Sequence, residues 1–108
     1  MINTPTEKAA AIMRHYGAEE QLTILCEECS ELIKEACKCR RKGIVMHDDM
    51  IEEMADVKIM LMQFESTMKL AEKALLERTV QEKLDRQIGR IENENRRFEE
   101  TPRESREN

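Results

Sequence analysis

One acidic pattern occurs twice in this sequence, and it constrains the fold more than any other feature. The first copy is L-C-E-E-C-S-E-L over residues 25–32, and the second is M-I-E-E-M-A-D-V over residues 50–57. When the two copies are aligned, apolar positions match apolar positions and acids match acids. Each copy places two acids three residues apart beside apolar residues at helical spacing. The pattern therefore predicts two amphipathic helices of similar construction.

The composition favours helices along the whole chain. Aromatic residues make up only 3% of the 108 residues, whereas Leu, Met, Glu, Lys, Arg and Ala are frequent. These residues are good helix formers, and a sheet protein would normally contain more Val, Ile, Thr and Tyr. We predict an all-α fold of four helices, with one domain over residues 1–97. The charged segment 98–108 lacks apolar periodicity, so we expect it to be a disordered tail.

Helix boundaries are predicted from capping residues. Thr6 is the expected N-cap of a first helix that reaches Tyr16, and Gly17 ends it. A second helix should run from 18 to 42 and end at Gly43. A third should have His47 or Asp48 as its N-cap and end near 68–70. The third has an apolar arc too wide for one neighbour, so it should be the central helix. A fourth helix should follow, with its apolar stripe at Leu76, Val80, Leu84, Ile88 and Ile91.

The short connection at 43–47 predicts that the second and third helices form an antiparallel hairpin. Packing two like-patterned helices on equivalent stripes brings their acid edges together. The carboxylates expected to converge are Glu28, Glu31, Glu53 and Asp56. Such a cluster must protonate, separate or bind a cation, and oxygen-only ligands suit Mg²⁺, with Mn²⁺ as a substitute. The alternative is a set of solvated acids that pair with Lys34, Lys38 or Lys58.

Charge and hydropathy exclude some classes of partner. The net charge of −5 disfavours a general nucleic-acid binder, which would usually be basic. No apolar run approaches the roughly 20 residues that cross a bilayer, and the N-terminus has no apolar signal-peptide region. We therefore expect a cytoplasmic protein that binds neither nucleic acid nor membrane.

Four cysteines, at positions 26, 29, 37 and 39, raise the possibility of zinc. In the reducing cytosol they should be free thiols. On a helix, Cys26, Cys29 and Cys37 are expected to share the apolar side, while Cys39 points away from it. Three small core residues are therefore favoured over a zinc site, although a cysteine-based zinc-binding regulatory protein stays an alternative.

The paired segments E-E-C-S-E-L and E-E-M-A-D-V resemble the E-x-x-E … E-x-x-D signature of the MazG-like nucleoside triphosphate pyrophosphohydrolases. The segments Y-G-A-E-E-Q-L and E-K-L-D-R-Q-I-G-R-I are also similar to small, phage-type members, so the resemblance covers about 16–91. It implies a MazG-like helical fold that assembles as a dimer or a dimer of dimers. It also implies Mg²⁺-dependent hydrolysis of a nucleoside or deoxynucleoside triphosphate to the monophosphate and pyrophosphate.

The resemblance assigns residue roles as well. Glu28, Glu31, Glu53 and Asp56 fall on the metal ligands of the family. The segment K-L-D-R resembles the basic segment that follows the acid motifs, which makes Lys83 and Arg86 candidate phosphate contacts.

Glu27 precedes a predicted ligand directly, so it is the candidate to orient or deprotonate the attacking water. A solvated Glu27, and a surface pair of Arg86 with Glu82, are the corresponding alternatives. A helical interaction module that keeps the fold without the activity is the alternative to an enzyme.

Overall fold

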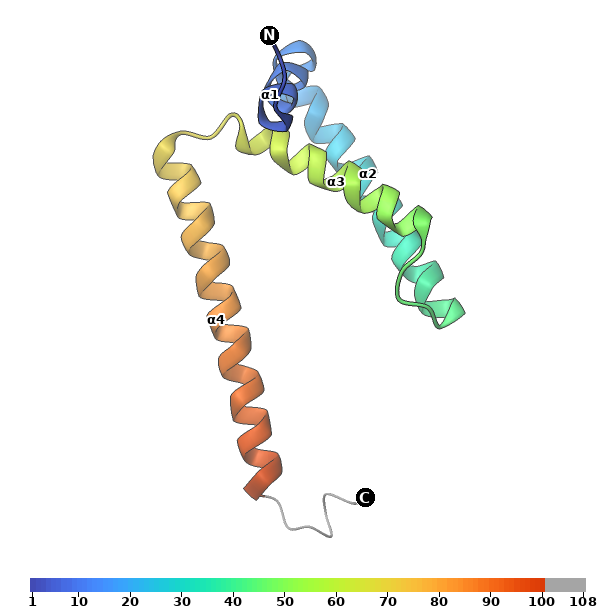
Figure 1. Cartoon of the computed structure of the whole chain (residues 1–108), viewed down its shortest axis with the longest axis vertical. Helices are drawn as coiled ribbons and strands as arrows, with labels where there is room; N and C mark the ends of the chain where they lie inside the picture. Colours follow the sequence, from blue (N-terminus) through green and yellow to red (C-terminus); the bar gives the residue numbers. More distant parts are fainter. Residues whose placement is uncertain (101–108) are drawn as a thin grey trace. The chain divides into compact units, whose positions relative to one another are not determined.

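The computed structural model describes residues 1–100 as four helices, with no strand among them, so the predicted all-α class is confirmed (Figure 1). The helices are α1 (Pro5–Tyr16), α2 (Ala18–Lys42), α3 (Asp48–Glu65) and α4 (Leu70–Glu100). The chain divides into two compact units, Met1–Met68 and Lys69–Asn108. The predicted domain 1–97 spans both units and stays a prediction.

Helix α1 begins two residues earlier than predicted. Thr4, and not Thr6, is the N-cap, and its hydroxyl accepts a hydrogen bond from the backbone N–H of Glu7 at 3.1 Å. Pro5 occupies the first helical position, where its fixed φ suits the helix and its missing N–H has no cost. Thr6 therefore lies inside the first turn.

The predicted bounds of α2 are confirmed, because a glycine with positive φ stands at each end. Gly17 has φ 88° and Gly43 has φ 69°, a region that residues with a Cβ rarely adopt. The N–H of Ile44 also donates to the carbonyl of Cys39 at 3.0 Å, which closes the C-terminus.

Helix α3 begins as predicted and ends earlier than predicted. His47 is the N-cap, since its Nδ1 accepts from the backbone N–H groups of Asp49 at 3.1 Å and Met50 at 3.4 Å. The helix ends at Glu65 and not near 68–70. The hydroxyls of Ser66 and Thr67 donate to the carbonyls of the last turn, and thus supply the partners that a continued helix would have supplied.

Helices α2 and α3 form the predicted antiparallel hairpin, and α3 also packs against α1, as expected of a central helix (Figure 1). Side-chain contacts show the direction. Near the start of α2, Gln21 contacts Gln63 at the end of α3, and near the end of α2, Glu35 contacts His47 at the start of α3. Residue numbers therefore increase along α2 in the direction in which they decrease along α3, as in an antiparallel pair.

In α2 and α3, the face that packs against the neighbouring helix lies closer to the acidic residues than the sequence predicts. The predicted apolar stripe of α2 consists of Leu25, Cys29, Leu32 and Ala36, of which Ala36 is exposed and the other three are half-buried. The most buried side of the helix instead carries Gln21, Glu28, Glu35 and Cys39. The centre of this side lies about 65° around the helix from the centre of the predicted stripe, in the direction of Glu28. As a result, Glu28 and Glu53 are half-buried, whereas Glu31 and Asp56 are exposed.

The same rotation overturns the expected placement of the cysteines. Cys39 is buried, with 5% of its surface exposed, while Cys26 and Cys37 are exposed and Cys29 is half-buried. Cys39 lies four residues after Glu35 on the packed side of α2. Two of the three cysteines predicted in the core, Cys26 and Cys37, are therefore on the surface.

Two glutamines form the deepest polar contact of the hairpin. The Nε2 of Gln21 donates to the Oε1 of Gln63 at 2.8 Å, and the two residues are only 5% and 2% exposed. Because a buried amide without a partner is costly, we expect Gln63→Leu to lower the free energy of unfolding by about 1–3 kcal/mol. The double variant Gln21→Leu/Gln63→Leu should recover most of that loss. Urea unfolding of the three proteins measures both effects, and equal losses in the single and double variants would contradict the pairing.

Helix α4 is longer than predicted. It runs to Glu100, whereas the sequence predicts a disordered tail from residue 98. Residues 98–100 of the predicted tail are therefore helical, and 101–108 lie outside the described residues. Val80, Leu84, Ile88 and Ile91 of the predicted stripe are all exposed.

None of the helices in the described part of the chain has the length and apolar character that crossing a membrane requires.

Candidate functional site

The hairpin brings together three of the four acids predicted to converge. Glu28 lies on α2, and Glu53 and Asp56 lie on α3, with one carboxylate oxygen of each within 4.8 Å of the others. Glu28 and Glu53 are half-buried and Asp56 is exposed, so the cluster opens to solvent on one side. Ligand atoms at this spacing can converge on a single cation.

Glu31 lies outside this group and is exposed. Its negative charge still acts on the cluster, because it contributes to the raised pKa of Glu53. Glu31 follows Glu28 by three residues, which places it about 60° further around α2, away from the centre of the packed side. The structure thus separates one predicted ligand from the other three.

Burial and repulsion between neighbouring carboxylates disfavour the ionised forms of Glu28 and Glu53. Burial raises the pKa of Glu28, and the negative charge of Asp56 raises it further. Burial also raises the pKa of Glu53, followed by the charge of Asp56. One oxygen of Glu53, Oε2, is buried and has no hydrogen-bond partner among the described residues. Such an oxygen normally needs a donor or a cation.

The raised pKa values predict how metal-free stability depends on pH. A carboxyl group with a higher pKa in the folded chain takes up its proton first in that state, so its contribution to stability rises as the pH falls from neutral through the folded-state pKa. We therefore expect the melting temperature of the double variant Glu28→Gln/Glu53→Gln to exceed that of the wild type at pH 7. The advantage should shrink at pH 5.

Calorimetry at the two pH values, in EDTA, makes this comparison. Subtracting the wild type from the variant removes the contribution of carboxylates outside the cluster. An advantage that is the same at both pH values would show that Glu28 and Glu53 do not repel their neighbours in the folded protein.

A second group of possible ligands lies at the turn between α2 and α3. Glu35, His47 and Asp49 also place ligand atoms within 4.8 Å of one another. The hydrogen bonds of His47 argue against a metal there. Its Nδ1 accepts from two backbone N–H groups, so the proton of the neutral ring sits on Nε2. An Nε2 that carries a proton cannot bind a metal, and moving that proton to Nδ1 would destroy the cap of α3.

Glu27 and the two basic candidates are all exposed. Glu27 is next to Glu28, and its charge raises the pKa of that acid. Lys83 and Arg86 lie three residues apart on one face of α4, in the second unit of the chain. Among the described residues, Glu82 contacts Arg78 at 3.9 Å and forms no ion pair with Arg86, the pairing given above as the alternative.

Sequence reasoning missed Glu35, Gln21 and Gln63 as residues of the hairpin interface. A signal was available, since Gln21, Glu28 and Glu35 follow one another at intervals of seven, which places them on one helix face. No cysteine belongs to either group of possible ligands in the described residues. Comparisons with protein-family models, with curated proteins and with solved structures found no match.

Proposed function

We propose that this protein hydrolyses nucleoside or deoxynucleoside triphosphates to the monophosphate and pyrophosphate, with Mg²⁺ as cofactor. One observation carries the proposal: Glu28 from α2 meets Glu53 and Asp56 from α3, with ligand oxygens within 4.8 Å of one another. These are three of the four positions that the MazG-like signature assigns to metal ligands.

The residues present fit a hard divalent cation. The donor set consists only of carboxylate oxygens, which Mg²⁺ and Mn²⁺ prefer. The buried Oε2 of Glu53 has no hydrogen-bond partner in the described part of the chain, and a cation would satisfy it. Glu31 is near enough to add negative charge. When bound, the ion neutralises phosphate charge and polarises water.

Each remaining candidate has a role in the proposed reaction. The oxygen of a water molecule attacks a phosphorus atom of the α–β phosphoanhydride, the bridging P–O bond breaks, and Glu27 accepts the proton of the water. Lys83 and Arg86 supply positive charge to the phosphate oxygens. The products are a nucleoside monophosphate and pyrophosphate.

Assembly as a homodimer or homotetramer belongs to the same proposal. Its support is the apolar surface that the chain leaves uncovered, which soluble monomers rarely expose to this extent. On α3 the exposed residues include Ile51, Met54 and Leu61. A second copy of the chain would cover such surface and stabilise a small core.

A panel of the common ribonucleoside and deoxyribonucleoside triphosphates, incubated with Mg²⁺, tests the proposed activity. We expect pyrophosphate to be released from at least one nucleotide, and release should stop when EDTA is added. Orthophosphate in place of pyrophosphate would indicate cleavage at another bond and would contradict the proposed reaction.

The alternative is a helical interaction module without enzymatic activity. The exposed stripe of Val80, Leu84, Ile88 and Ile91 on α4 favours it, because an unpartnered apolar face suits a protein partner. A panel that releases no pyrophosphate, from protein that is folded and loaded with Mg²⁺, would support this alternative.

A further inference from the structure

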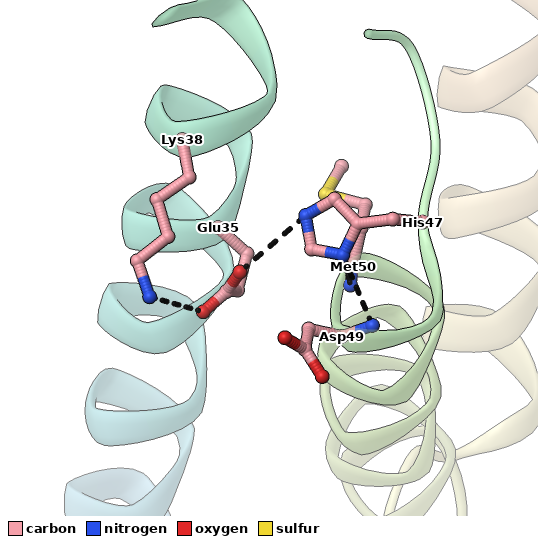
Figure 2. Close-up of polar contacts among 5 residues, drawn as sticks. All are labelled: Glu35, Lys38, His47, Asp49 and Met50. Atoms are coloured by element: carbon pink, nitrogen blue, oxygen red, sulfur yellow. Dashed lines mark hydrogen bonds and ion pairs between the residues drawn. The ribbon is translucent and has the colours of Figure 1, made fainter. Parts of the chain in front are cut away.

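Glu35 is a buried acid that the proposed reaction does not use. Only 7% of its surface is exposed, and its Oε1 contacts the Nζ of Lys38 at 3.2 Å. Its other oxygen, Oε2, points across the hairpin to the Nε2 of His47 at 3.6 Å (Figure 2). Neither Oε2 nor this Nε2 has a hydrogen-bond partner among the described residues. We call this arrangement of Lys38, Glu35 and His47 the turn clasp.

The turn clasp connects α2 to α3 beside the turn of the hairpin. Because the capping bonds leave the proton of the neutral imidazole on Nε2, an N–H group faces the carboxylate of Glu35. In a buried environment of low dielectric, this charge–dipole attraction is stronger than it would be in water. The ring of His47 is also the N-cap of α3, so it ties the first turn of that helix to α2.

The clasp lies two helical turns from the acid cluster on the same face of α2, since Glu35 follows Glu28 by seven residues. On α3, Glu53 and Asp56 follow the capped first turn. An α-helix is stiff over two turns, so holding the start of α3 against Glu35 fixes which residues of α3 stand opposite Glu28. The negative charge of Glu35 also reaches the cluster, where it helps to raise the pKa of Glu53.

We propose that Glu35 and His47 are positioning residues, which hold α3 in the register that brings Glu53 and Asp56 to Glu28. For metal binding this inference rests on the proposed function, since that cluster is the proposed site. The register itself can be tested without metal. In the absence of the clasp, α3 is held near its C-terminal end by the Gln21–Gln63 pair, and its N-terminal end can shift.

The test variant is His47→Asn. Asparagine is a favourable N-cap, so the helix start is kept while the N–H that faces Glu35 is lost. Glu35→Gln provides a second variant that removes the charge and keeps the shape. The matched control is Thr4→Ala, which removes the cap of α1 and leaves the hairpin contacts in place.

Two measurements on the full-length chain, at a temperature where every variant is folded, test the inference. The first is Mn²⁺ affinity by titration calorimetry. We expect it to fall about tenfold in His47→Asn and in Glu35→Gln, as for groups that orient metal ligands, and to be unchanged in Thr4→Ala. The double variant should lose only slightly more Mn²⁺ affinity than the single variant with the larger loss, because the two residues act as a pair.

The second measurement is the nuclear Overhauser effect between the side chains of Glu28 and Asp56 in metal-free protein. It should weaken in His47→Asn, while the effect between Gln21 and Gln63 stays as an internal reference. Unchanged Mn²⁺ affinity together with an unchanged Glu28–Asp56 effect would overturn the positioning role and leave the proposed function standing. If the wild type binds no Mn²⁺ but the Glu28–Asp56 Overhauser effect weakens in His47→Asn, the proposed metal site is wrong and the positioning role stands.

Discussion

Asp56→Asn is expected to lower kcat/KM for the hydrolysed nucleotide by at least about a hundredfold. Changes to groups that only orient metal ligands cost about 10- to 100-fold in activity, so removing a ligand charge should cost more. Asp56 is one of three acids with oxygens within 4.8 Å, and its charge is the strongest electrostatic influence on the other two. Pyrophosphate release at saturating Mg²⁺ measures the loss.

The same variant should stay folded, and in EDTA it should melt at a higher temperature than the wild type, because it relieves repulsion between acids. Glu65→Gln is the matched control, since Glu65 is an exposed acid on the same helix and lies outside the cluster. Near-normal turnover in Asp56→Asn would show that this acid does not bind the catalytic metal.

Arg86→Ala is expected to lower kcat/KM about ten- to a hundredfold. Charge-assisted hydrogen bonds are worth roughly 1.5–3 kcal/mol each, and the guanidinium can hold two phosphate oxygens at once. Lys83→Ala should have a smaller effect, since an ammonium group acts on phosphate as a point charge. Mn²⁺ affinity should be unchanged in both variants, because the three clustered acids are untouched. Steady-state kinetics and calorimetry together measure these effects.

Arg78→Ala is the control for general loss of charge on α4. Arg78 is exposed and contacts Glu82 at 3.9 Å, an arrangement worth at most about 1 kcal/mol of stability. Its removal should leave the kinetics unchanged. If Lys83→Ala and Arg86→Ala both behave like this control, neither residue contacts the substrate.

The helix boundaries that could be predicted from sequence are those with a strong backbone signal. Gly17 and Gly43 adopt positive φ, and both bounds of α2 were predicted correctly. The start of α1 was misplaced because Thr4 and Thr6 are both plausible caps, although Pro5 at the first helical position favours Thr4. The end of α3 has no glycine, and the hydroxyls of Ser66 and Thr67 that close it give a weaker signal.

The candidate site was predicted in part, for a similar reason. Spacing alone placed Glu28, Glu53 and Asp56 on facing helices, and the structure brings these three together. The rotation of each helix about its own axis is not encoded in spacing. It depends on which side chains pack across the interface, and here polar contacts such as Gln21 with Gln63 lie in that interface. That rotation placed Glu28 in the interface and buried Cys39, whereas Glu31, about 60° further around α2, is exposed.

The small number of buried apolar residues has a consequence for the lifetime of the folded protein. Among the described residues, the buried apolar side chains are those of Ala9, Met13, Cys39 and Met60. A chain with so little buried apolar surface is close to its unfolding threshold, so any ligand that binds only the folded form raises the folded fraction. Proteases degrade the unfolded fraction. We therefore expect the protein to resist proteolysis for longer when its site and its exposed apolar faces are occupied, so that its lifetime depends on its ligands.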